Sequence, residues 1–112
     1  MTNDFYCDEV LSGNTQVEKV KETENVLAYH HTRPFYPLHI VAITKKHISS
    51  LITLDESDHS LLLELMLVIK EIAAEITEKH GSCKVITNLG KYQDSKHLHW
   101  HIVSGESLNF RS

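Results

Sequence analysis

The sequence predicts an α+β domain: a five-stranded, mainly antiparallel sheet with one long helix and a short N-terminal helix. Three observations point to this class. Residues 97–105 alternate histidine with apolar residues at period two, which is typical of a half-buried strand. The segment that ends at His80-Gly81 repeats apolar residues at helical spacing over about 25 residues. Short segments rich in β-branched residues, separated by turn residues, supply the remaining strands. A chain of 112 residues should form one domain, residues 1–112, with a single core.

The predicted elements can be placed in chain order. Residues 4–13 should form a short helix or turn that ends at Gly13. Five segments are expected to form the strands: residues 17–22, 25–31, 39–43, 84–88 and 97–105. Pro34 and Pro37 should stiffen the loop before the third of these strands. Residues 89–96 form a loop that leads into the last strand.

The long helix is expected to begin at a capping box, Thr53-Leu54-Asp55-Glu56, and to end just before Gly81. The residues that should cover the sheet are Leu62, Leu65, Met66, Ile69, Ile72, Ala73 and Ile76. The first half is apolar nearly all round, because it also carries Leu61, Leu63, Leu67 and Val68. One sheet cannot bury all of this surface, so we expect a homodimer in which a second copy packs on the helix. The alternative is that loop 31–38 covers it.

Composition restricts the partners and the compartment. The formal net charge of −4 argues against a nucleic-acid polymer, which needs a basic surface, but suits a small nucleotide. No apolar run approaches about 18 residues and the amino terminus is polar, so we expect no membrane span and a cytoplasmic protein. Cys7 and Cys83 are too few for a disulfide framework. Residues 106–112 form a polar tail whose role the sequence does not define.

The histidine-rich strand is the candidate site. His97, His99 and His101 should project from one face of this strand, and the apolar residues between them from the other. Imidazole titrates near neutrality, so such a row can bind phosphate, move protons or hold a metal. Over four residues of strand the first and last Cα atoms lie about 13 Å apart, which is awkward for one tetrahedral ion. Two of the three could still share a metal with ligands from elsewhere. We regard the wet face of an edge strand or an expression tag as weaker explanations.

The segment His97-Leu98-His99-Trp100-His101-Ile102-Val103 resembles the H-φ-H-φ-H-φ-φ signature of the histidine-triad (HIT) superfamily of nucleotide hydrolases and transferases. The other segments that match the family pattern are residues 5–13, Val26-Leu27-Ala28-Tyr29, Arg33-Pro34, His39-Ile40-Val41-Ala42-Ile43, Lys45-Lys46-His47-Ile48 and Asn88. The resemblance covers nearly the whole chain. It is closest to the short histidine-triad nucleotide-binding proteins.

The resemblance implies a covalent mechanism. The central triad histidine, His99, would attack an α-phosphorus and become transiently nucleotidylated, a choice that its two histidine neighbours favour independently. His101 would bind phosphate and assist the leaving group, while His97 and His39 would form the buried network that orients His99. An amine, phosphate or nucleotide would leave, and water would then release the nucleotide. No cofactor is required in this scheme, although magnesium can accompany a polyphosphate substrate. Because the third triad member is His101 and not Gln, the chain resembles the hydrolase branches.

The resemblance also implies how the substrate is held. The residues that match substrate-binding positions are Asn88, Gln93, Ser95, Phe5 and His31. Phe5 would wall the base pocket, and Asn88 would lie near phosphate and ribose. His31 stands where the nucleotide-binding branch places a ribose-binding Asp, and the loop before the triad carries an unexpected acidic Asp94. Base and sugar preference therefore stay open.

Bacterial relatives often bind zinc through a Cys-x-x-Cys near the start of the chain. Here Asp4 occupies the position that would partner Cys7, so that zinc site is not carried over intact and no metal is assigned. His47 is expected to be mainly structural.

The leading hypothesis is a hydrolase of purine-nucleoside phosphoramidates or related adenylylated compounds. The alternatives are a dinucleoside polyphosphate hydrolase, a non-catalytic nucleotide sensor and a metal-binding protein.

Overall fold

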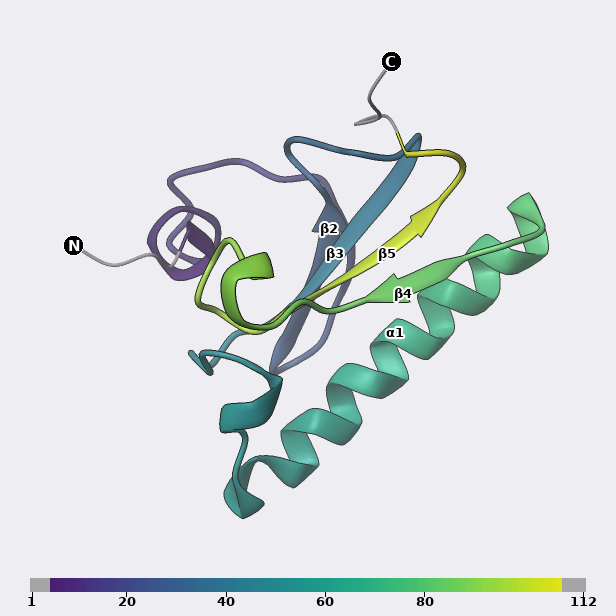
Figure 1. Cartoon of the computed structure of the whole chain (residues 1–112). Coiled ribbons are helices and arrows are strands. Elements are labelled where there is room, and N and C mark those ends of the chain that lie inside the picture. The colour runs from purple at the N-terminus through teal and green to yellow at the C-terminus, as the bar shows by residue number, and fades with distance from the viewer. Residues whose placement is uncertain (1–4, 108–112) are drawn as a thin grey trace.

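The computed structural model describes residues 5–107 and contains a five-stranded sheet with one long helix along one face (Figure 1). The strands are β1 (Lys19–Glu22), β2 (Val26–His30), β3 (Leu38–Thr44), β4 (Lys84–Ile86) and β5 (His99–Ser104). The helix α1 spans His59–His80, and a short π-helical segment, η1, spans Tyr6–Leu11. Every neighbouring pair in the order β1-β2-β3-β5-β4 is antiparallel. The predicted fold class is confirmed.

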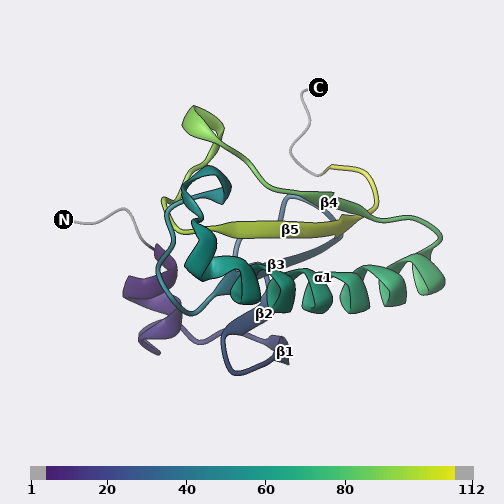
Figure 2. The same ribbon diagram turned by 90° about the horizontal axis from the view of Figure 1, so that it is seen from below.

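The sheet has two differently covered faces because side chains alternate along each strand. The face covered by α1 is packed with Val26, Ala28, Ile40, Ala42, Leu98 and Ile102, which meet Leu65, Val68, Ile69, Ile72 and Ile76 of the helix. The opposite face forms a second cluster with η1, made of Tyr6, Val10, Leu27, Tyr29, Val41 and Ile43. Figure 2 shows α1 lying along the strands and the N-terminal segment at one end of the sheet. This division leaves the second face available for the histidines.

Four predicted strands are shorter in the structure, and hydrogen bonds explain the change in two of them, β4 and β5. β5 begins at His99, because the N–H of Leu98 donates to the carbonyl of Ile48 at 2.6 Å and takes no part in the ladder. β4 ends at Ile86, because the Thr87 hydroxyl, and not a main-chain group, donates to the His99 carbonyl at 2.8 Å. Both changes end the β4–β5 pairing at the start of β5, beside the cavity described below.

The predicted capping box at residues 53–56 is wrong. The Thr53 hydroxyl already accepts the N–H of Ser50 at 3.0 Å, as part of a box that caps a 3-10 turn at Leu51–Thr53. A second box, Asp55 to Asp58, caps another 3-10 turn at Glu56–Asp58. Residues 54 and 55 are extended, so α1 begins only at His59 and has 22 residues. Its predicted end is confirmed: Gly81 has φ +88° and its N–H donates to the Thr77 carbonyl at 2.8 Å.

The outer face of α1 is partly apolar. Leu63 and Leu67 are 61% and 47% exposed, whereas Val68 faces the sheet and is buried. Loop 31–38 does not cover this surface, because Phe35 and Tyr36 contact His39 on the opposite face of the sheet. The loop alternative is therefore wrong. Within residues 5–107, no helix combines the length and apolar character needed to cross a membrane.

Candidate active site

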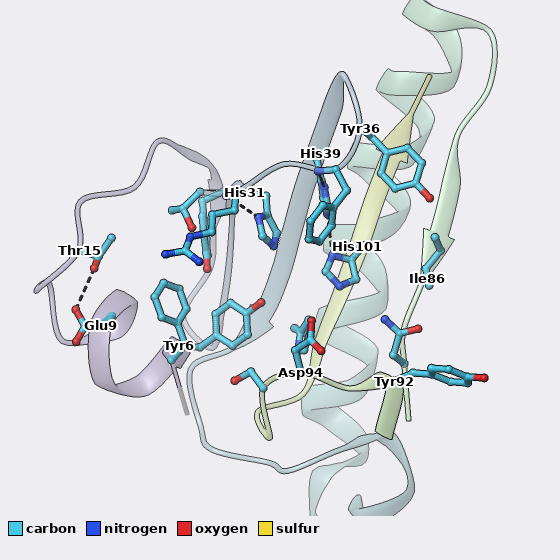
Figure 3. A pocket seen from close by; sticks show the side chains of 18 of the residues that line it. Tyr6, Glu9, Thr15, His31, Tyr36, His39, Ile86, Tyr92, Asp94 and His101 are labelled. Carbon is cyan, nitrogen blue, oxygen red and sulfur yellow. Dashed lines mark hydrogen bonds between the residues drawn. The ribbon is translucent and has the colours of Figure 1, made fainter. Parts of the chain in front are cut away.

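The candidate site is a cavity of about 1020 Å³ on the face of the sheet opposite α1 (Figure 3). Its walls come from η1, from the loop between β2 and β3, from the end of β4 and from the segment that precedes β5. The imidazoles of His31, His39, His99 and His101 all line it. Segments distant in the sequence therefore meet around one group of titratable rings.

The strand register explains why the rings meet. β3 and β5 pair so that Val41 lies opposite His101 and Ile43 opposite His99. His39, two residues before Val41, points to the same face and lies diagonally beside His101. His39 Nε2 is 2.9 Å from His101 Nδ1, and the rings of His99 and His101 are 5.0 Å apart between centroids.

The protonation of His99 is fixed by a main-chain group. His99 Nδ1 lies 2.7 Å from the carbonyl oxygen of His97. A carbonyl only accepts, so Nδ1 carries the proton and Nε2 keeps its lone pair. The ring is 4% exposed, and the Tyr6 ring lies over it at 4.9 Å between centroids. Burial lowers the pKa of His99 below its ordinary value, which keeps the ring neutral. Its free nitrogen is therefore a nucleophile near neutral pH.

A chain of hydrogen bonds fixes the next two rings. The N–H of Phe35 donates to His39 Nδ1 at 2.9 Å, so His39 carries its proton on Nε2 and donates it to His101 Nδ1. His101 therefore presents an N–H, at Nε2, to the cavity. Burial, with the neighbouring ring of His31, lowers the pKa of His39 to about 4. Burial, with the three neighbouring histidines, lowers that of His101 to about 3. Protonation of His39 or His101 would break one of these hydrogen bonds.

His31 extends the group. Its Nδ1 accepts the N–H of Arg33 at 3.0 Å, and its ring lies 4.3 Å from that of His39 between centroids. One nitrogen from each of His31, His39 and His101 lies within 4.8 Å of the others, a spacing that a metal could bridge. However, each of these rings already uses its lone pair to accept a hydrogen bond. This cluster therefore presents donors, and its chemistry does not suit a cation.

A second cluster fits a metal better. Donor atoms of Cys7, His47 and His97 lie within 4.8 Å of one another. His97 donates its Nε2 proton to the Thr44 carbonyl at 2.6 Å, so its Nδ1 lone pair accepts from the Cys7 thiol at 3.4 Å. Thiolate and imidazole are the ligands that zinc prefers. Cys7, His47 and His97 thus fit a zinc ion, while Asp4 lies outside the described residues.

The structure separates the predicted substrate-binding residues into two groups. Those that line the cavity are Phe5, His31, Asn88 and Ser95. Gln93 does not line it, which corrects its placement among the substrate contacts. Its buried side-chain amide donates to the carbonyls of Ser49 and Ser95, at 2.7 and 2.8 Å. Gln93 therefore links the loop before β5 to the segment at Ser49, and its role is structural.

Some features of the site were not predicted. Phe35 and Thr44 fix the tautomers of His39 and His97 through main-chain groups, for which no side-chain pattern gives a signal. The carboxylate of Asp94 lines the cavity, and its charge favours protonation of His99. The sequence places Asp94 in the loop before the triad, but a negative charge argues against a position beside a phosphate.

Comparison with known proteins identifies relatives of this chain. A family model for the HIT domain matches residues 12–108. A HIT-like protein of Chlamydia muridarum is 33% identical over 102 residues, covering 90% of this chain and 81% of the relative. A HIT-like protein of Synechococcus elongatus is 31% identical over 109 residues, covering 96% of each chain.

Solved structures give the same result. A histidine triad protein from Clostridium difficile superposes with a TM-score of 0.79 at 32% identity, covering all of this chain and 98% of the other. A HIT family hydrolase from Legionella pneumophila superposes with a TM-score of 0.80 at 25% identity, covering 96% of each chain. The fold is that of HIT family hydrolases.

Proposed function

The chain belongs to the HIT domain family, and we propose that it is a nucleotide-binding hydrolase that cleaves nucleoside phosphoramidates or related adenylylated compounds at the α-phosphate. The observation that carries this proposal is the tautomer of His99. Its Nδ1 proton is engaged by the His97 carbonyl, so the Nε2 lone pair is free beside donors from neighbouring rings. A neutral imidazole nitrogen is a good nucleophile toward phosphorus.

The proposed reaction has two steps. In the first, the His99 Nε2–P bond forms while the bond from phosphorus to the leaving nitrogen breaks, and this nitrogen takes up one proton and departs as an amine. In the second, a water oxygen attacks the same phosphorus, the Nε2–P bond breaks, and the water gives up one proton. The N–H of His101 that opens to the cavity donates to the phosphate oxygens as their charge grows. The proton that the leaving nitrogen takes up and the proton that the attacking water gives up are exchanged with solvent.

Two groups outside the reacting atoms complete the proposal. Cys7, His47 and His97 would hold a zinc ion, whose contribution there is structural: it would tie η1 to the segment before β5. The carboxylate of Asp94 is a ligand type that Mg²⁺ prefers, which favours dinucleoside polyphosphate hydrolysis with magnesium as the second candidate.

We also propose a cytoplasmic homodimer. The chain has two cysteines, Cys7 and Cys83, too few for a disulfide framework, as is usual in a reducing compartment. Leu63 and Leu67 are exposed next to each other on α1, one turn apart, where a second copy would bury them.

The decisive experiment measures turnover of adenosine 5′-phosphoramidate by the wild type and by His99→Gly. We expect a loss on the order of 10³-fold or more, since a triad member acts as part of a unit. The matched control is His59→Gln, an exposed histidine at the start of α1. Mass spectrometry of the wild type quenched during turnover should detect one added nucleotidyl group, absent in His99→Gly. Undiminished turnover by His99→Gly would remove His99 from this role. Faster cleavage of dinucleoside tri- or tetraphosphates would favour the second candidate, and nucleotide binding without any turnover would favour a sensor.

A further inference from the structure

We infer that His31 and Arg33 form a second anion subsite in the cavity, for a phosphate group that the nucleotide carries in addition to the one attacked by His99. This inference rests on the proposed function and specifies its substrate class: nucleotides with more than one phosphate. The two residues lie just after β2, at the start of the loop to β3, and both line the cavity.

His31 presents a donor to the cavity. Its Nδ1 accepts the N–H of Arg33 at 3.0 Å, so its proton sits on Nε2, on the other side of the ring. Figure 3 shows this bond on the loop side of the ring, while the rest of the ring extends over the cavity toward His101. A ring N–H directed at the cavity can donate a hydrogen bond to a phosphate oxygen or another acceptor. It cannot accept a hydrogen bond from a ligand hydroxyl.

The position of the His31 ring is fixed by its neighbours. The N–H of His31 donates to the carbonyl of His39 at 2.8 Å, which continues the β2–β3 pairing by one residue. Its ring lies 4.3 Å from that of His39 and 5.7 Å from that of His101, between centroids. The ring of His31 is therefore held beside that of His101. The two rings are close enough to contact adjoining groups of one ligand.

Arg33 supplies the charge. Its side chain is exposed and lines the cavity, and no ion pair among residues 5–107 engages its guanidinium. A guanidinium binds phosphate oxygens through paired, charge-assisted hydrogen bonds. The loop that carries it is stiffened by Pro34 and Pro37. A neutral donor and a free cation from the same short segment thus point to an anionic ligand group.

The acidic residues that line the cavity are Asp8, Glu9 and Asp94, and the last two are engaged away from this subsite. A carboxylate oxygen of Glu9 accepts the Thr15 hydroxyl at 3.0 Å. The charge of Asp94 acts on His99, and Figure 3 shows Asp94 below His101 and His31 above and to the left of it. The lone pairs of His31, His39 and His101 are all occupied, so the same place does not offer a cation site. Donors and positive charge therefore gather at the His31 end.

The second phosphate can come from two sources, which binding measurements distinguish. It can follow the first along a polyphosphate chain, as in adenosine diphosphate. It can also sit on the sugar, as in adenosine 2′,5′- or 3′,5′-bisphosphate. We would measure the dissociation constants of these three nucleotides and of adenosine monophosphate by calorimetry at fixed ionic strength, because phosphate contacts depend on salt.

The variants are Arg33→Gln, Arg33→Lys and, as a charge-matched control, Lys91→Gln, an exposed residue that does not line the cavity. We expect at least one two-phosphate nucleotide to bind the wild type on the order of tenfold more tightly than adenosine monophosphate. Arg33→Gln should lose most of this gain, Arg33→Lys should keep part of it, and Lys91→Gln should keep all of it. His31→Asn, which retains an N–H donor without the ring, should also keep part of the gain.

Several outcomes would overturn the inference. Equal wild-type affinities for adenosine monophosphate and all three two-phosphate nucleotides would exclude a second subsite, and so would a gain that survives in Arg33→Gln. Binding and cleavage of one-phosphate compounds in the same preparation would then leave the proposed function intact. If no nucleotide binds the wild type, both the proposed function and this inference fail.

Discussion

Replacing Gly105 by alanine tests how the loop between β2 and β3 is held over the histidines. Gly105 has φ +91°, and a Cβ built there would lie 2.8 Å from Cγ and 3.0 Å from Cδ of Pro37. These distances are well inside ordinary carbon–carbon contact, which begins at about 3.5 Å. The proline ring is rigid, so the strand end, the loop or both must move. This loop supplies the amides of Arg33 and Phe35 that fix two histidine rings.

The magnitude follows from two separable terms. A non-glycine residue in the left-handed region costs about 1–2 kcal/mol. Overpacking against Pro37 adds about 1–3 kcal/mol. Gly81→Ala is the matched control, because Gly81 has φ +88° and nothing lies within 4 Å of its added Cβ. We therefore expect Gly105→Ala to lower the free energy of unfolding by about 2–5 kcal/mol, and Gly81→Ala by about 1–2 kcal/mol.

The assay combines urea unfolding with phosphoramidate turnover under conditions in which each variant is folded. Gly105→Ala should also lower kcat, because displacement of the loop weakens the N–H donated to His39, whereas Gly81→Ala should not. Equal losses of stability in the two variants would refute the close approach. Unchanged kcat in a clearly destabilised Gly105→Ala would refute the link from this contact to the histidines.

Three further predictions concern stability, assembly and metal. The pKa values of His39 and His101 are about 4 and 3 in the folded chain, against an ordinary value of 6.5, so the unfolded chain binds more protons below pH 6.5. The free energy of unfolding should therefore fall as the pH drops from 6.5 to about 4.5, by on the order of 2 kcal/mol per ring before solvent screening, in urea titrations. Leu63→Glu combined with Leu67→Glu should convert a dimer to a monomer in sedimentation, while changing the stability of the monomer by about 0.5 kcal/mol or less. Purified protein should contain about one zinc per chain by elemental analysis, and Cys7→Ser should lose most of it and melt at a lower temperature.

Each of these has a control and a contrary result. Replacing exposed His80 by glutamine should leave the pH slope unchanged, and a flat profile in the wild type would contradict the neutral, buried rings. Lys70→Glu, on the same helix, should leave the oligomeric state unchanged, and a wild-type monomer would contradict the dimer. Cys83→Ser should retain zinc, and zinc content independent of Cys7 would contradict that site.

Period-two alternation was enough to predict which face of the sheet carries the histidines, because side-chain direction in a strand depends only on position. The start of α1 was predicted incorrectly for a local reason. Thr53, Asp55 and Asp58 can each cap a turn, and only the structure shows that the Thr53 hydroxyl is already engaged by Ser50. Gln93 was misplaced similarly, since its spacing from the triad does not reveal that its amide binds main-chain carbonyls behind the cavity.

The direction of the ring lone pairs decides what this site can bind, and it could not be predicted from side chains. The same rings with their protons exchanged would present lone pairs and would suit a cation. Instead, the amides of Arg33 and Phe35 occupy the lone pairs of His31 and His39, so these rings present N–H groups. His99 has the opposite tautomer, because its Nδ1–H donates to the His97 carbonyl and its Nε2 lone pair is left in the cavity. One nucleophilic nitrogen surrounded by donors matches an electrophile that carries negative oxygens, and a phosphate ester or amide is such a group.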